Sequence, residues 1–400
     1  MTQEAFLHPD RLLPPYEPAL SIARDLFEAV VDLPVISPHG HTDPAWFAQN
    51  KPFTNATELF LIPDHYLLRM LKSRGISYDQ LGVPRRDGAP VADSRSAWRT
   101  FAENFHLFAG TPSQMWVDHA FNFAFGIEEG LNANNADRLY DEINSRLADP
   151  DLLPLAVLDR ANVEAIATTE FALDDLSHHH TLKDKGLIGR IRTTYRPDDV
   201  TDPDAPGLAA NIAKLAELTG EDTANWAGLI EAHRKRRAFF REFGAVATDH
   251  GVPTARTADL PLAQKQGLLS DALAGQLDAD GAELFRAQMM TEMAGLAVED
   301  GMVMQIHAGS NRNTDPTLMN ERGPNMGADI PTTTDIVGGL QPLLARYGND
   351  ANFRLLLFTL DETTSARELA PIAGYWPSVM IGPPWWFHDS TQGMRRFREQ

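Results

Sequence analysis

Short apolar runs recur along the chain and alternate with longer segments of helical periodicity. Each run is bounded by Gly, Pro, Asp or other polar residues, which is typical of buried strands. The runs cover residues 33–37, 163–168, 187–193, 245–248, 302–306, 355–359 and 378–382. The pattern therefore predicts seven strands.

The segments between the runs carry apolar residues three or four positions apart. Phe285, Met289, Met293 and Leu296 form one such stripe, and Gly301 follows it as the expected helix C-cap. A methionine stripe with this spacing indicates packing in a core rather than a cofactor site.

Strands that alternate with helices predict a parallel α/β sheet, either open or closed into an eight-stranded barrel. Two intervals, at about 66–155 and 252–300, have helical patterns and exceed a normal connection. We interpret both as helical insertions on a single barrel domain that spans residues 1–400.

Charge and composition narrow the function. The chain has 35 Lys and Arg against 55 Asp and Glu, a net charge of −20, which argues against a nucleic-acid partner. An anionic substrate would therefore need local arginines. The absence of cysteine excludes disulfides, thiolate metal sites and a cysteine nucleophile. No apolar run reaches the ~20 residues of a spanning helix, so we expect no membrane partner and a cytoplasmic location.

The most specific local motif is His39-Gly40-His41, directly after the first apolar run. Residues i and i+2 of a strand point to the same side, so both imidazoles can converge on one metal ion. Gly40 lets the backbone approach closely. The competing interpretation is two unrelated loop histidines, and the position at a strand end favours the metal.

Two other histidines follow apolar runs. His250 and His307 lie where barrel enzymes place ligands or acid–base groups, although a buried structural histidine fits each as well. The run at 245–248 lacks the lysine that bridges two ions in many hydrolytic barrels, so we expect one metal ion. The histidines at 178–180 and the basic residues at 234–237 are interpreted as solvated helix surface.

Arg196 follows the third run, where a guanidinium could hold a carboxylate bidentately. On the sequence alone we favour the competing interpretation, a surface ion pair with Asp198 or Asp199. His65 and Tyr66, in the first insertion, are candidates for acid–base chemistry or for contacts to substrate hydroxyls.

Near the other end, Trp385 and Trp386 follow the seventh run and could stack on a sugar ring. Packing at the rim of the barrel is the equally weighted alternative.

Taken together and in this order, the motifs resemble those of the uronate (glucuronate) isomerases, a divergent branch of the amidohydrolase superfamily. The matching segments are His39-Gly40-His41, Asp64-His65-Tyr66, Tyr195-Arg196-Pro197, Thr248-Asp249-His250-Gly251, Gln305-Ile306-His307 with Arg312-Asn313, and Trp385-Trp386-Phe387. The resemblance implies a distorted (β/α)8 barrel. It also implies a hexuronate substrate, with D-glucuronate converted to D-fructuronate and D-galacturonate to D-tagaturonate through an enediol.

The resemblance also assigns roles to residues. It implies one divalent metal, usually zinc, bound by His39 and His41. It implies catalytic or substrate-binding roles for a further set: Tyr66, His65 and His307 as catalytic residues, and Arg196, Arg312, Trp385 and Trp386 as substrate-binding residues. We also expect a homo-oligomer.

One feature departs from the family pattern. The family continues into a further strand that ends in Asp-x-Arg, where the Asp ligates the metal and the Arg helps to bind substrate. The sequence stops at Gln400, and the pattern predicts seven strands, so the eighth is absent from it. We expect the natural polypeptide to continue. Asp361, after the sixth run, is the only substitute ligand we can name, and we do not favour it.

Two other functions fit the same barrel. One is a mononuclear metal-dependent amidohydrolase, in which a metal-bound hydroxide attacks an amide or ester. The other is a catalytically dead barrel that acts as a binding module. The ordered Asp-His-Tyr and Tyr-Arg-Pro segments favour the isomerase over the hydrolase, and the missing strand keeps the binding module open.

Overall fold

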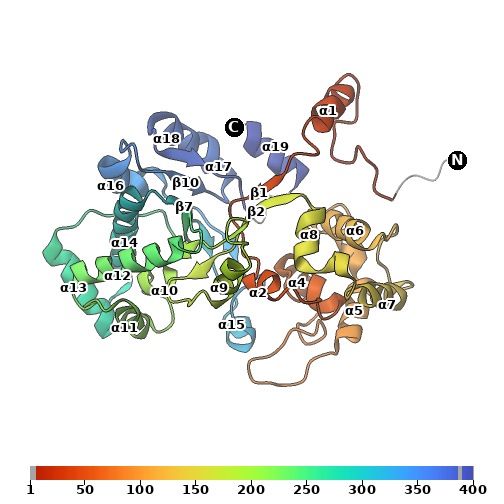
Figure 1. Ribbon diagram of the computed structural model, residues 1–400, viewed down its shortest axis with the longest axis horizontal. Coiled ribbons are helices and arrows are strands. Elements are labelled where there is room, and N and C mark those ends of the chain that lie inside the picture. Colours follow the sequence, from red (N-terminus) through yellow and green to blue (C-terminus); the bar gives the residue numbers. More distant parts are fainter. Residues whose placement is uncertain (1–5, 386–389, 400) are drawn as a thin grey trace. The chain divides into compact units, whose positions relative to one another are not determined.

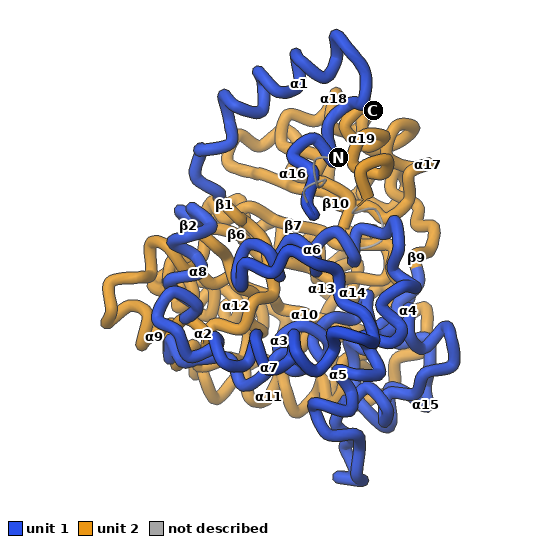
Figure 2. The backbone as a smooth tube through the Cα atoms, turned by 90° about the vertical axis from the view of Figure 1, so that its right-hand side faces the viewer, with its two compact units in different colours: residues 1–35, 49–164, 311–330 blue, residues 36–48, 165–310, 331–400 orange. Residues whose placement is uncertain are grey.

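The computed structural model describes residues 6–385 and 390–399. The chain divides into two compact units (Figure 2). Unit 1 comprises residues 1–35, 49–164 and 311–330, and unit 2 comprises residues 36–48, 165–310 and 331–400. Each unit has a hydrophobic core of its own. The elements at the points of division are β1(Val35–Ser37), α2(Pro44–Gln49), β2(Val163–Ala167), β8(Ser310–Asn311) and β9(Ile330–Pro331).

Unit 1 is helical, as the pattern over 66–155 predicted. Its elements are α1(Ala19–Glu28), α3(Ala56–Phe60), α4(His65–Ser73), α5(Ser94–Glu103), η1(Phe105–Phe108), α6(Pro112–Phe125), α7(Ala136–Arg146), η2(Pro150–Leu152), α8(Pro154–Arg160) and α15(Pro316–Arg322). Capping side chains explain several of the starts, since Asp64 and Asp93 each accept backbone N–H groups at a helix N-terminus. Trp98, Phe101 and Phe121 lie at the centre of the core.

Parallel strands form the centre of unit 2. They are β3(Glu170–Phe171), β4(Ile191–Arg192), β5(Tyr195–Arg196), β6(Ala247–His250), β7(Val303–His307), β10(Leu355–Phe358) and β11(Val379–Ile381). One sheet has the strand order β1-β2-β4, and a second sheet has the order β11-β10-β7-β6-β5-β3. Every predicted apolar run contains or overlaps a strand. The second and third runs lead directly into β3 and β5, so the strands follow one another in chain order.

This sequential order is the one found in singly wound α/β barrels. Among the described residues, β1 and β11 each have a strand partner on one side only. The parallel α/β sheet is therefore confirmed, and closure into a barrel stays a prediction. The arrangement of the insertions on one barrel domain likewise stays a prediction.

Helices cover this sheet, and α14 packs against β7 (Figure 1). The helices of unit 2 are α9(Ser177–Asp184), α10(Asp198–Thr201), α11(Leu208–Thr219), α12(Trp226–Arg241), α13(Leu262–Ala274), α14(Ala279–Asp300), α16(Val337–Tyr347), α17(Glu362–Thr364), the π-helix η3(Ser365–Leu369), α18(Ala370–Tyr375) and α19(Thr391–Glu399). The methionine stripe of α14 is buried, and Gly301 ends the helix with φ 74°. Both features were predicted.

Three predictions about burial are wrong. Val35 and Ile36 of β1 are 49% and 61% exposed, so neither face of this edge strand is covered as a buried strand requires. His179, expected at a solvated surface, is buried within α9. Arg237 of α12 is also buried, because Asp300 accepts hydrogen bonds from its Nε and Nη2 at 2.7 and 2.9 Å.

Within the part of the chain that the structure describes, no helix combines the length and the apolar character that crossing a membrane requires.

Candidate functional site

The His39-Gly40-His41 motif lies in a loop. Strand β1 ends two residues before His39, so alternation along a strand does not account for the position of the two rings. The ring centroids of His39 and His41 are nonetheless 5.0 Å apart. A Cβ on Gly40 would lie 3.1 Å from the carbonyl oxygen of Ala167, so glycine allows the motif to pass close to β2.

Three side chains form a group that could hold a metal ion: His39, Asp249 and His307, with ligand atoms within 4.8 Å of one another. Asp249 lies near the end of β6, and His307 is the last residue of β7. These strands are parallel neighbours, in which Asp249 pairs with Gln305. The group is thus assembled at adjacent ends of two strands and the loop after a third.

Close contacts hold the His307 ring. Its Nδ1 lies 2.6 Å from Oδ1 of Asp249. The ring stacks on those of His39 and Phe358, with centroids 4.5 and 4.1 Å away. Trp385 meets it edge-on at 5.0 Å. Because Asp249 engages Nδ1, Nε2 is the ring nitrogen that remains for a metal or a substrate.

The protonation states of the group suit a cation. Burial lowers the pKa of His39 to about 4, so its imidazole is neutral at neutral pH. Its Nδ1 is buried without a hydrogen-bond partner among the described residues. Burial alone would raise the pKa of Asp249, but the hydrogen bond and charge of His307 and the charge of Arg196 hold it well below its usual range. A neutral imidazole and an ionised carboxylate are the forms that metal binding requires, so these residues fit a metal ion.

Two neighbouring histidines, His250 and His41, are not members of this group. His250 follows Asp249 on β6, and successive side chains of a strand point to opposite faces. Its Nε2 lies 3.0 Å from Oγ1 of Thr248, and burial lowers its pKa to about 3. His250 is therefore buried and lies outside the group of three. His41 is outside the group of three, although its ring lies against His39, and its role as a ligand stays a prediction.

Sequence reasoning did not single out Asp249. The segment Thr248-Asp249-His250 was noticed for its histidine, and Asp361 was the only carboxylate considered. Asp361 instead caps α17, where it accepts the N–H of Thr363. One signal could have identified Asp249: it lies near the C-terminal end of β6, and β6 is the neighbour of the strand that carries His307.

Arg196 forms ion pairs with two carboxylates of the protein. Its Nε donates to Oδ2 of Asp198 at 2.7 Å, and its Nη1 lies 3.1 Å from Oδ2 of Asp249. The favoured interpretation, an ion pair with Asp198, is confirmed. The pair is not on the surface, however, because the Arg196 side chain is only 16% exposed. A direct contact with a substrate carboxylate stays a prediction.

Unit 1 contains the remaining candidates. His65 and Tyr66 begin α4, and their rings stack with centroids 4.7 Å apart. The Tyr66 ring also meets Trp116 edge-on at 6.2 Å. Burial lowers the pKa of His65, so this imidazole is neutral at neutral pH.

Arg312 belongs to the same unit. Its Nη1 lies 3.4 Å from Oδ2 of Asp329, and Arg69 of α4 donates to the backbone oxygen of Asp329 at 3.2 Å. The charges of Asp329 and Arg312 both act on His65. The predicted residues His65, Tyr66 and Arg312 are thus brought together by α4 and the segment 311–330. Trp386, the last predicted residue, lies outside the described residues.

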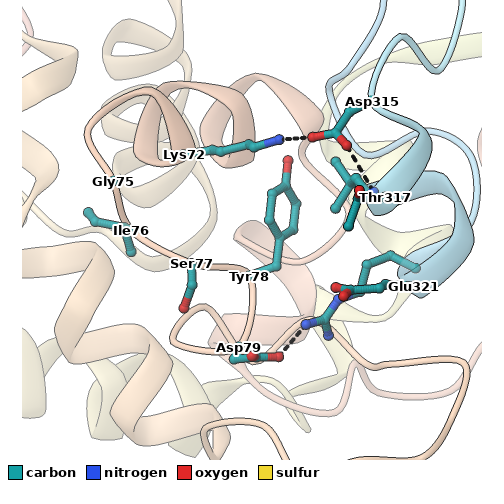
Figure 3. Close-up of a pocket in the computed structure, with 11 residues that line it drawn as sticks. Lys72, Gly75, Ile76, Ser77, Tyr78, Asp79, Asp315, Thr317 and Glu321 are labelled. Atoms are coloured by element: carbon teal, nitrogen blue, oxygen red, sulfur yellow. Dashed lines mark hydrogen bonds and ion pairs between the residues drawn. The ribbon is translucent and has the colours of Figure 1, made fainter.

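A pocket of about 400 Å³ lies in unit 1 between the C-terminal part of α4 and α15 (Figure 3). Within it Lys72 pairs with Asp315 and Arg322 pairs with Asp79. None of the predicted site residues lines it. We therefore do not assign the chemistry to this pocket.

A second buried cluster of titratable groups lies in unit 2. Glu170 of β3 accepts a hydrogen bond from the hydroxyl of Thr193, and its Oε2 is 3.8 Å from Nε2 of His179. The same ring nitrogen lies 3.0 Å from Oγ1 of Thr168. Burial raises the pKa of Glu170 to about 7 and lowers that of His179 to about 4.

This cluster makes stability depend on pH. The folded pKa of Glu170 exceeds the ordinary value, so its contribution to stability is complete below about pH 4.5 and is lost as the pH rises to about 7. Glu170→Gln cannot ionise. We expect it to match the parent near pH 4.5 and to be about 2–3 kcal/mol more stable at pH 8, measured by urea unfolding.

The exposed Glu164 of β2 provides a matched control, since Glu164→Gln removes a carboxylate without changing a buried one. An equal difference between Glu170→Gln and the parent at both pH values would show that folding does not raise the pKa of Glu170.

Comparisons with known proteins agree with one another. The sequence model of one family, described as glucuronate isomerase, matches residues 15–400. A uronate isomerase of Phenylobacterium zucineum is 52% identical over 400 residues, which cover 100% of this chain and 83% of that protein. A uronate isomerase of Xanthomonas campestris is 53% identical over 402 residues, covering 100% of this chain and 85% of that protein.

Solved structures give the same result. The crystal structure of a glucuronate isomerase from Caulobacter crescentus superposes with a TM-score of 0.96 and 50% identity, over 98% of this chain and 82% of that chain. A uronate isomerase from Thermotoga maritima superposes with a TM-score of 0.89 and 29% identity, over 98% and 84%.

Proposed function

Because the chain belongs to the glucuronate isomerase family, we propose that it is a uronate isomerase that interconverts D-glucuronate and D-fructuronate, and D-galacturonate and D-tagaturonate. Its substrate is a hexuronate. The observation that carries the proposal is the group of His39, Asp249 and His307, which supplies a site for chemistry in a chain that matches this family along its length. A homo-oligomer is part of the proposal.

The proposed cofactor is one zinc ion at the group of His39, Asp249 and His307, where Asp249 either binds the ion itself or orients, through Nδ1, a His307 ring that binds it. Two imidazoles and a carboxylate are a donor set that catalytic zinc uses, and the chain has no cysteine to offer a thiolate. When bound there, the ion supplies Lewis-acid polarisation of the substrate carbonyl. His41, next to His39, is the further ligand that the family resemblance implies.

The reaction moves protons without changing the overall redox state. A proton leaves C2 of the aldose and returns at C1, while a second proton passes from the oxygen on C2 to the oxygen on C1. We assign this work to His65 and Tyr66, because Asp249 engages one ring nitrogen of His307 and the other is left for the ion. Burial keeps His65 neutral, so the ring can accept a proton, and Tyr66 offers a hydroxyl beside it. Asp249 fixes the tautomer and orientation of His307.

The substrate carboxylate needs a cation in an acidic protein. Asp198, Arg196 and Asp249 together carry a formal charge of −1, so Arg196 alone does not make its surroundings attractive to an anion. Arg312 is better suited, because its side chain is 30% exposed and a substrate could therefore reach it. Trp385, beside His307, and Trp386 are proposed to line the pocket.

The function is tested by a coupled assay that follows reduction of the ketose product. We expect turnover of D-glucuronate that is lost after dialysis against a chelator and restored by zinc. Activity that survives removal of all metal would overturn the metal assignment. Failure to isomerise either uronate, with hydrolysis of amides or esters instead, would favour the amidohydrolase.

A further inference from the structure

The guanidinium of Arg196 is enclosed on three sides. Its Nε donates to Oδ2 of Asp198 at 2.7 Å, and its Nη1 lies 3.1 Å from Oδ2 of Asp249. On the third side, a Cβ added to Gly251 would lie 2.1 Å from Nη2, so the group rests directly on the glycine backbone. These three contacts hold the guanidinium in the orientation seen in the structure.

Asp198 is itself held in place. It is the first residue of α10, and the oxygen that binds Arg196 also accepts the backbone N–H of Gly251 at 3.1 Å. One carboxylate oxygen thus ties the end of β5 to the residue after β6. The side chain is 14% exposed, so water competes little for these hydrogen bonds.

Arg196 contacts the candidate metal group through one of its members, Asp249. One oxygen of Asp249 engages His307, and the other engages Arg196. Two partners on its two oxygens fix the plane of the carboxylate. A substitution that releases Arg196 would allow the Asp249 carboxylate to rotate, and the His307 ring would turn with it. Partners that orient ligands in this way typically change metal affinity about 10–100-fold when they are replaced.

We propose that Asp198 is a positioning residue of the metal centre: it orients Arg196, which in turn orients Asp249. Arg196 then acts through Asp249, and Gly251 is glycine because the guanidinium occupies the space of a side chain. This inference rests on the metal centre proposed above. It assigns a role to two residues, Asp198 and Gly251, that do not touch the ion.

The first test is Asp198→Asn, which keeps the shape of the side chain and removes its charge. Zinc affinity is measured by competition with a chromophoric chelator, and folding by thermal unfolding. We expect zinc to bind at least about 10-fold more weakly. The matched control is Asp202→Asn at the other end of α10, which removes a carboxylate from the buried Arg286. We expect that control to change zinc affinity less than about 2-fold.

The second test approaches the guanidinium from the other side. Gly251→Ala places a methyl group where Nη2 lies, and we expect a similar loss of zinc affinity. Its control is Gly267→Ala in α13, where a Cβ would meet nothing within 4 Å. Asp198→Glu, which keeps the charge, should recover part of the affinity that Asp198→Asn loses. If Asp198→Asn does not fold, the zinc affinity of Gly251→Ala tests the proposal.

The outcomes separate this inference from the function on which it rests. A parent protein that binds no zinc overturns the metal centre and the inference together. If the parent binds zinc and Asp198→Asn or Gly251→Ala binds it equally well, only the inference is wrong. It is also wrong if Asp202→Asn weakens zinc binding as much as Asp198→Asn at the same loss of thermal stability.

Discussion

Asp249→Asn is expected to abolish zinc binding and to lower kcat/KM for D-glucuronate by about 10³-fold or more. The change keeps the size of the side chain but removes the charge that faces His307, Arg196 and the ion. Replacing the carboxylate of a histidine–carboxylate pair by an amide costs on the order of 10⁴ in rate in a well-studied enzyme, because the histidine tautomer is no longer fixed. The measurements are zinc content after gel filtration and the coupled isomerase assay.

A matched variant separates this effect from loss of stability. Asp300→Asn removes the carboxylate that binds Arg237, whose side chain is 1% exposed. Breaking that buried pair should cost about 3–5 kcal/mol of stability without changing zinc content. If Asp249→Asn keeps one zinc ion per chain and near-parent kcat/KM, Asp249 is only a structural partner of Arg196.

Tyr66→Phe is expected to lower kcat by about 10²–10³-fold with a small change in KM, because acid–base groups contribute 10²–10⁴-fold. Phenylalanine keeps the ring that stacks on His65 and meets Trp116, so only the hydroxyl is lost. Steady-state kinetics on D-glucuronate measure the effect, and solvent exchange at C2 of the substrate shows whether proton removal is the step that slows.

Tyr78→Phe serves as the comparison within the same unit. The hydroxyl of Tyr78 donates to the backbone oxygen of Met326, and the residue lies outside the proposed site. We expect it to lose some stability and to keep its kcat. Parent-like kinetics for Tyr66→Phe would assign the proton transfer to His65 instead.

The hydrophobic pattern predicted most of the framework of unit 2. Every apolar run contains or overlaps a strand, and the methionine stripe of α14 is buried as expected. Such features depend on short-range periodicity, which a sequence displays directly. The burial of β1 was predicted wrongly because an edge strand and a central strand have the same apolar composition.

The candidate site was predicted only in part. The histidines after strand ends were identified, and His39 and His307 do meet. Asp249 was not chosen, and Arg196 proved to hold two carboxylates instead of one. His250, the neighbour of Asp249 on β6, was considered from the sequence, and that side chain is buried beside Thr248.

The sequence by itself determined the order of strands and helices, the absence of thiolate chemistry, and the strand ends at which polar residues gather. Only the tertiary structure decided which of those residues share a site. A sequence displays the period of a strand but not which residue of the neighbouring strand lies beside each of its positions. The register of β6 against β7 sets that choice, bringing Asp249 to His307 and turning His250 away. It also places Asp198 and Gly251 around Arg196, a contact between residues that no local pattern connects.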